Sequence, residues 1–206
     1  NIKLIVDKTC SKKFVAGPIA KGRNVAIENA SYKHIAATDA GCVLDSRWLE
    51  EIVKPFEDES VDVVSGWYET QITNEFQKIY ASIAMPKLET VDRDNFLPSS
   101  RSIAFKKSCW KQVGGYPTMT YTAEDTKYDL DLKNMGCQFV FNEKAFVYWE
   151  CPLDFLEMVR KQIAYGYGDG QLLINKSAIL KQLVIVCFPV LLYIRNRRNS
   201  IASILI

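Results

Sequence analysis

The chain has 206 residues, of which 48% are hydrophobic and 24% are charged, and its formal net charge at pH 7 is only +2. This composition excludes disorder and favours one sizeable hydrophobic core. So small a net charge gives no general attraction to nucleic acid, and we expect no nucleic-acid partner. The charge is uneven, because residues 170–206 contain five basic and no acidic side chains and therefore carry +5.

The histidine and cysteine content narrows the chemistry further. His34 is the only histidine, which excludes a His-rich zinc site and a pair of histidine acid/base groups. Its apolar surroundings favour a packed imidazole over a catalytic one. The six cysteines are dispersed without a Cys-x-x-Cys pair, which favours reduced thiols in the cytosol over a metal or redox motif. The chain starts at Asn1 without a signal peptide or initiator methionine, so we expect a fragment or a processed chain.

Short apolar runs alternate with segments of helical period, which predicts an α/β domain with a mostly parallel sheet. The first helix is predicted to start at Pro18, and the last, an amphipathic helix around 156–163, to end in the glycines of 166–170. We predict strands at 2–6, 34–38, 61–67, 102–105, 137–141 and 145–149, and further helices at 48–56, 106–113 and 124–135. We expect one domain, 1–170, followed by a C-terminal helical appendage, 171–206.

The first candidate site residue stands where a predicted strand ends. The strand at 34–38 is followed directly by Asp39, Ala40 and Gly41. In open parallel sheets, ligands bind just beyond the carboxyl ends of the strands. A carboxylate there, with small neighbours, suits a hard divalent cation that grips phosphate oxygens. The alternative is an aspartate that only begins a turn.

Two adjacent acids, Glu124 and Asp125, open the predicted helix that ends at Met135. The helix dipole favours acids in a first turn, so capping is one explanation. However, these residues precede Tyr128 by four and three positions and therefore extend its buried stripe. A carboxylate placed there could take a proton from an attacking hydroxyl.

Two further segments combine basic and polar side chains. Arg23 and Asn24 lie close to the helix start at Pro18, where free backbone N–H groups could help to hold a phosphate. The turn Ser99-Ser100-Arg101 leads into a predicted strand, and its arginine could bind a phosphate or carboxylate with two hydrogen bonds. A solvated helix face and an ordinary loop are the alternatives.

The order of these features is more specific than any one of them. From the Asp-Ala-Gly strand end, the chain continues through Ser-Ser-Arg-Ser, Gly-Gly-Tyr and Glu-Asp to Arg160-x-Gln162 with nearby aromatic residues. Over roughly residues 15–170 this series resembles the inverting glycosyltransferases of family 2, which have the Rossmann-like GT-A fold. The resemblance implies that the domain is a GT-A-like catalytic domain, truncated at its N-terminus.

The resemblance also implies roles for the candidate residues. Asp39, with Ala40 and Gly41, would belong to the metal and diphosphate site, with Mg²⁺ or Mn²⁺ as the metal. Asp125 would be the general base, next to Glu124. The donor-binding residues would further include Arg23, Asn24, Ser99, Ser100 and Arg101, and the segment that closes over the diphosphate and acceptor would include Arg160, Gln162 and Tyr165.

Two departures from the family pattern stand out. The usual Asp-x-Asp motif has Gly41 at its third position here, which removes one metal-ligand carboxylate. Asp45 could replace it, but its capping position at the next helix argues against this. Family members also begin with two strands that hold the base and ribose. Nothing before Asn1 supplies them, so we expect the chain to lack these first strands.

The C-terminal appendage suggests a membrane surface. Residues 183–194 are uncharged and mostly apolar, but the run is too short to cross a bilayer, which needs about 20 apolar residues. The alternatives are a core helix and an interfacial segment. The +5 charge of 170–206 favours the cytoplasmic, inner face of the cell membrane.

These observations predict an enzyme of the hexosyltransferase type, which moves a sugar from a nucleoside-diphosphate sugar to a hydroxyl of a glycan or lipid-linked acceptor, with inversion. Gly41 and the missing strands favour an alternative, a noncatalytic fragment or regulatory binding module of the same fold. A sugar-nucleotide-forming nucleotidyltransferase would need a glycine-rich basic loop near its first strand, and the sequence has none there. The first hypothesis requires Asp39 and Asp125 to converge on one cleft.

Overall fold

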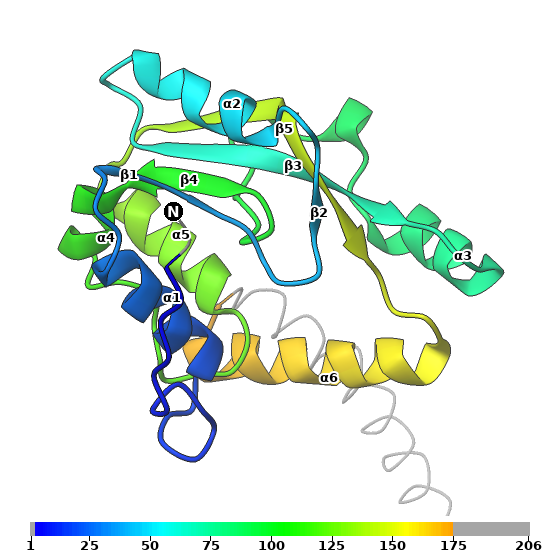
Figure 1. The fold of residues 1–206 in the computed structure, drawn as a ribbon. Coiled ribbons are helices and arrows are strands. Elements are labelled where there is room, and N and C mark those ends of the chain that lie inside the picture. Colours follow the sequence, from blue (N-terminus) through cyan, green and yellow to red (C-terminus); the bar gives the residue numbers. More distant parts are fainter. Residues whose placement is uncertain (1–2, 175–206) are drawn as a thin grey trace, which may run out of the picture.

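A computed structural model describes residues 3–174, in which five strands form one mixed sheet between helices (Figure 1). The strand order is β1-β4-β3-β5-β2. The strands are β1 (His34–Ala37), β2 (Val43–Leu44), β3 (Val63–Gln71), β4 (Ile103–Lys106) and β5 (Phe139–Glu150). The α/β class predicted from the sequence is confirmed.

The prediction of a mostly parallel sheet is wrong in detail. β3 and β5 pair in parallel, but β1–β4, β3–β4 and β2–β5 pair antiparallel. β1, β3 and β5 still share one direction, as the alternation of strands and helices predicts. The chain leaves β3, forms α3 (Glu75–Ala84) beyond that end of the sheet, and returns as β4 between β1 and β3 (Figure 1). β4 therefore runs against both neighbours.

Helices cover both faces of the sheet (Figure 1). α2 lies on one face, α1, α4 and α5 lie on the other, and α6 runs below them. The helices are α1 (Pro18–Glu28), α2 (Trp48–Val53), α4 (Lys107–Gln112), α5 (Glu124–Asn134) and α6 (Phe155–Leu172), and short 3₁₀ turns span Lys54–Glu57 and Leu88–Thr90.

The strands divide their side chains between two hydrophobic clusters, because successive residues of a strand point to opposite faces. Val63 of β3 and Phe105 of β4 pack with Tyr128 and the other apolar residues of α1, α4 and α5. Val64 of β3 and Ala104 of β4 pack with the apolar residues of α2 on the opposite face. The sheet is thus covered on both sides, as an α/β fold requires.

Most predicted elements form, but several differ from the prediction. Residues 3–6 of the first predicted strand are not in a strand, and the two strands predicted at 137–141 and 145–149 are one long strand, β5, with a register shift opposite Ser65 and Trp67. α3 and β2 were not predicted. The fully buried side chain of α3 is Gln77, which donates to the Cys151 carbonyl and accepts from the Thr73 hydroxyl.

The last helix also differs, because α6 continues through Gly166, Gly168 and Gly170 to Leu172. Gly168 packs directly on the loop before α5: a Cβ atom at this position would lie 2.6 Å from the Thr122 carbonyl oxygen. This glycine therefore permits close packing and does not end the helix. The expected boundary at 170/171 falls inside α6, and the apolar run at 183–194 lies outside the described residues.

Gly168 and Gly166 are expected to respond in opposite ways to alanine. Gly168→Ala should lower the free energy of unfolding by about 1–3 kcal/mol, because the added methyl group overlaps backbone atoms. Gly166 has open space around it, so Gly166→Ala should raise the free energy of unfolding by up to about 1 kcal/mol through helix propensity. Urea denaturation of both variants checks this, and equal effects would contradict the close packing of α6.

Within residues 3–174, no helix is both long enough and apolar enough to span a membrane.

Candidate functional site

A cavity of about 690 Å³ lies between the sheet, α5 and α6, and many predicted site residues line it. They come from α1, the end of β1, the turn before β4, the start of α5, and α6. These residues are Arg23, Asp39, Ala40, Arg101, Glu124, Asp125, Gln162 and Tyr165. Asp39 and Asp125 therefore do converge on one cavity, as the sequence-based hypothesis requires.

Arg23 of α1 joins the two acidic segments of this cavity. Its Nη2 lies 2.5 Å from Asp39 Oδ1, and its Nη1 lies 2.7 Å from Glu124 Oε1. The Arg23 side chain is only 17% exposed. Burial lowers the pKa of Arg23, but Asp39, Tyr116 and Glu124 together raise it above its usual value. Arg23 thus remains a cation that the two carboxylates share, and Arg101 is the other cation on the described cavity wall.

Asp39 stands in a tight turn that follows β1. The Cys42 backbone N–H donates to the Asp39 carbonyl oxygen at 3.2 Å. Gly41, within this turn, has a φ of +88°, in the left-handed region that side chains with a Cβ rarely adopt. This backbone conformation explains why a glycine occupies the third position of the Asp-x-Asp pattern here. Asp45, the alternative carboxylate, instead accepts a hydrogen bond from the Arg47 backbone N–H.

Glu124 and Asp125 begin α5 directly after Ala123, which has a left-handed φ of +64°. The two acids differ in environment. Glu124 is buried against Arg23, and burial followed by the nearby Asp125 raises the pKa of Glu124. Asp125 is half-buried, and its Oδ1 accepts the Thr126 backbone N–H at 2.8 Å. Asp125 is therefore the acid of this pair that has no cationic partner within the described residues.

Arg101 forms the cationic part of the opposite wall. Its Nη1 donates to Ser99 Oγ at 2.8 Å, and its guanidinium carbon lies 4.0 Å from the centre of the Trp149 ring and 5.1 Å from that of Tyr68. Cation–π contacts of this kind hold a guanidinium in place while it keeps its charge. A fixed, charged arginine suits the binding of phosphate oxygens.

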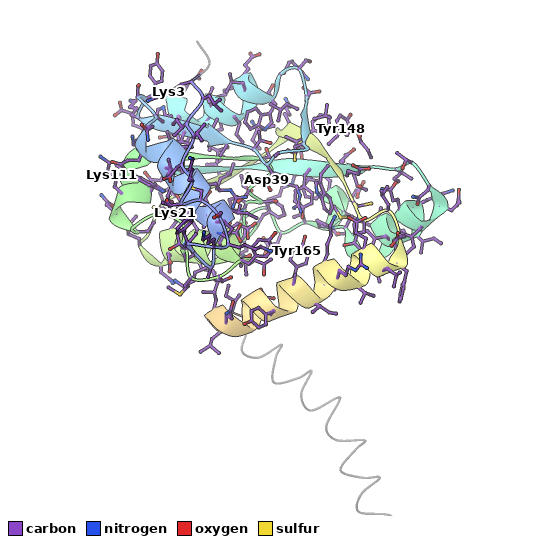
Figure 2. All side chains as sticks on the ribbon, turned by 60° about the horizontal axis from the view of Figure 1, so that its bottom comes forward. Lys3, Lys21, Asp39, Lys111, Tyr148 and Tyr165 are labelled. Atoms are coloured by element: carbon purple, nitrogen blue, oxygen red, sulfur yellow. The ribbon has the colours of Figure 1, made fainter. Side chains whose placement is uncertain are left out.

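α6 supplies the remaining wall and is fastened to the loop before α5. The Thr122 hydroxyl donates to the Ala164 carbonyl oxygen at 2.7 Å. Figure 2 shows Tyr165 on the side of α6 that faces the body of the protein, below Asp39. Asp169, one turn further along the helix, also lines the cavity.

Asp169 is a site residue that the sequence analysis missed. Burial, and then the nearby Asp125, raise the pKa of Asp169. Gln162, Tyr165 and Asp169 are spaced three and four residues apart and share one helix face. The spacing can be read from the sequence. However, the helix was predicted to end in the glycines of 166–170, so Asp169 was not assigned to this helix face. The aromatic residues Tyr68, Tyr80 and Trp149 were missed as well.

Some predicted site residues lie outside the cavity lining. Asn24 supports the fold, because its carboxamide binds the backbone N–H and carbonyl of Tyr116 and accepts from Trp110 Nε1. Ser100 is buried, with 3% of its surface exposed. The others outside the lining are Gly41, Ser99 and Arg160.

Two groups of residues away from the cavity, around His34 and around Asp62, have structural roles. His34 stacks on Phe56 with 4.3 Å between the ring centres, which confirms the packed imidazole. Asp62, Cys109 and Cys137 bring their potential ligand atoms within 4.8 Å of one another, although the cysteines are far apart in sequence. The Lys106 ammonium group already binds Asp62 at 2.9 Å and neutralises its carboxylate. A dication would have to displace this lysine.

Comparisons with known proteins add the following. The family model described as "Glycosyl transferase family 2" matches residues 18–120, which is half of the chain. One similar solved structure is the mannosyltransferase PcManGT from Pyrobaculum calidifontis in complex with GDP-Man and Mn²⁺, with 20% sequence identity and a TM-score of 0.48. That match covers 65% of this chain but only 36% of the mannosyltransferase. A comparison with curated proteins gave no match.

Proposed function

We propose that this chain, which belongs to glycosyl transferase family 2, transfers a hexose from a nucleoside-diphosphate sugar to an acceptor hydroxyl, with inversion at the anomeric carbon. The observation that carries the proposal is the shared cavity. Asp39, which suits the diphosphate end, and Asp125, which suits proton transfer, line one cavity although 85 residues separate them in the sequence.

In this mechanism Asp125 is the general base. The acceptor oxygen forms a bond to the anomeric carbon while the bond from that carbon to the diphosphate breaks, and the leaving nucleoside diphosphate keeps the electron pair. Asp125 takes the hydroxyl proton, which typically contributes about 10²- to 10⁴-fold to the rate. A single displacement of this kind inverts the anomeric centre. Glu124 cannot share this role, because Arg23 already binds its carboxylate.

The diphosphate end would be bound by Arg101 and Asp39. Mg²⁺ is commonly held by one or two carboxylates together with substrate phosphates. Arg23 binds Oδ1 of Asp39, so Oδ2 of this carboxylate would bind the metal, and Arg101, which lines the same cavity, would bind the diphosphate. Mg²⁺ or Mn²⁺ bound there would offset negative charge on the departing diphosphate. Arg23 keeps Asp39 in position through their ion pair. Gln162 and Tyr165, which line the cavity, would close over the diphosphate and acceptor, and Arg160, which lies on the same helix outside the lining, would contribute its positive charge from the surface.

The acceptor in this proposal is a glycan or lipid-linked hydroxyl at the cytoplasmic face of the cell membrane. The +5 charge of residues 170–206 supports this location, because basic segments are retained on that side and attract anionic lipids.

Gly41 favours one competing function, a noncatalytic binding module of the same fold. Its position in the Asp-x-Asp pattern removes a carboxylate that other members use. Such a module would not need a carboxylate base, whereas this chain keeps Asp125 on the cavity wall without a cationic partner within residues 3–174.

A thermal-shift experiment separates the two functions. UDP, GDP and their hexose conjugates should raise the melting temperature, and Mn²⁺ should increase this effect. A ligand at 100 times its dissociation constant stabilises a protein by about 2.7 kcal/mol. Asp39→Asn should reduce the Mn²⁺-dependent part of the shift. No shift with any of these nucleotides would favour the noncatalytic module.

A further inference from the structure

We infer that the cavity selects an uncharged sugar as its acceptor and holds this sugar against α6 through Tyr165 and Asp169, opposite the Asp125 carboxylate. The inference rests on the proposed function and names the acceptor class for the same cavity. It also adds Asp169 as an acceptor-binding residue.

The first argument is the placement of α6. Tyr165 and Asp169 are four residues apart on one face of this helix, and both line the cavity. Two contacts hold this face in place. The Thr122 hydroxyl donates to the Ala164 carbonyl oxygen, and Gly168 packs on the Thr122 backbone. The loop that bears these contacts leads directly into Glu124 and Asp125. This loop therefore fixes the position of α6 relative to the proposed base, Asp125.

The second argument is charge. On the described cavity wall the cations are Arg23 and Arg101, and Arg23 is neutralised by Asp39 and Glu124. Arg101 lies against Trp149, the side that we assign to the donor diphosphate. Asp169 and Asp125 face the remaining space without a cationic partner within the described residues. Two carboxyl groups repel a phosphorylated acceptor, whereas their oxygens can accept hydrogen bonds from sugar hydroxyls.

The third argument is the apolar surface beside these carboxyl groups. Tyr165 from α6 and Tyr80 and Met85 from α3 and its C-terminus line the same cavity. Tyrosine offers an apolar ring face together with a polar hydroxyl. Sugar rings likewise have apolar C–H faces and hydroxyl edges. An aromatic surface next to a carboxylate therefore matches a neutral sugar better than it matches a phosphate group.

The test uses methyl glycosides of mannose, glucose and N-acetylglucosamine, together with their 6-phosphates. With donor present, the whole chain should transfer to at least one neutral glycoside and at least tenfold less well to its 6-phosphate. Asp169→Asn should raise the KM for the neutral glycoside about tenfold or more and reduce the discrimination against the phosphate. Tyr165→Ala should also raise this KM. The dissociation constant of the donor should remain unchanged in Asp169→Asn.

Tyr167→Ala is the matched control, because Tyr167 is an exposed tyrosine on the same helix that does not line the cavity. It should leave every parameter at the wild-type value. Equal use of neutral and phosphorylated glycosides, or a KM in Asp169→Asn and Tyr165→Ala that matches Tyr167→Ala, would overturn the inference while donor binding still upholds the proposed function. A wild-type chain that binds no nucleoside-diphosphate sugar would overturn both.

Discussion

Asp125→Asn is expected to slow sugar transfer by about 10²- to 10⁴-fold while donor affinity stays near the wild-type value. Asparagine has nearly the same shape as aspartate but cannot accept the hydroxyl proton at neutral pH. Its side-chain oxygen can still accept the Thr126 backbone N–H, so the start of α5 should keep its structure. The measurements are single-turnover transfer rates and donor binding by calorimetry.

Asp131→Asn serves as the control on the same helix. Asp131 forms a partly exposed ion pair with Lys127 one turn away on the same helix and does not line the cavity. Its loss should change the free energy of unfolding by less than about 1 kcal/mol and leave transfer unchanged. An Asp125→Asn variant with wild-type turnover would remove Asp125 from the role of base.

Arg23→Met is expected to have the largest effect on stability. The substitution leaves the carboxylates of Asp39 and Glu124 without their shared cation, and Glu124 is only 8% exposed. Breaking a buried ion pair costs about 3–5 kcal/mol. Because a third of the Asp39 side chain is exposed, we expect about 3 kcal/mol for this site. Chemical denaturation at pH 7 measures the loss, and donor binding should weaken with it.

The loss in Arg23→Met should depend on pH. Burial already raises the pKa of Glu124, and removing Arg23 removes a contribution that lowers it. A carboxyl group whose pKa is higher in the folded state binds more protons folded than unfolded. Stability therefore decreases as pH rises from the usual glutamate value of 4.5 through the raised pKa. The variant should recover part of its lost stability, relative to wild type, as pH falls through this window.

Lys127→Met is the matched control for Arg23→Met. It removes the cation of the partly exposed Lys127–Asp131 pair in α5 and should cost less than about 1 kcal/mol at any pH. If Arg23→Met were no more destabilising than Lys127→Met, the Arg23 network would not hold the cavity together.

Local patterns in the sequence were sufficient to predict most elements and several cavity residues. The apolar run that ends at Asp39 predicted β1, and the apolar stripe through Tyr128 predicted α5 and the direction of Glu124 and Asp125. Gly136, the second residue after α5, has a φ of +87°, a backbone conformation that favours glycine at a helix end. These predictions succeeded because burial of one face and the backbone preference of glycine act over a few residues.

Contacts between distant segments were decided by the tertiary structure alone. Nothing local distinguishes Asn24, whose carboxamide binds Tyr116, from a residue that faces a ligand. The direction of β4 depends on how the chain returns after α3, and the length of α6 depends on the close approach of Gly168 to Thr122. Arg23 binds Glu124, 101 residues away, so its carboxylate partner could not be inferred from spacing.

The sequence by itself therefore determined the α/β class, the family resemblance and the placing of Asp39 and Asp125 at the ends of their elements. Only the tertiary structure showed that Arg23 neutralises Asp39 and Glu124, and that Asp169 shares the cavity with Asp125. The physical reason is the distance along the chain over which each effect acts. Hydrophobic period and backbone propensity act along a few residues of chain, whereas charge pairing and the lining of a cavity depend on distances in space.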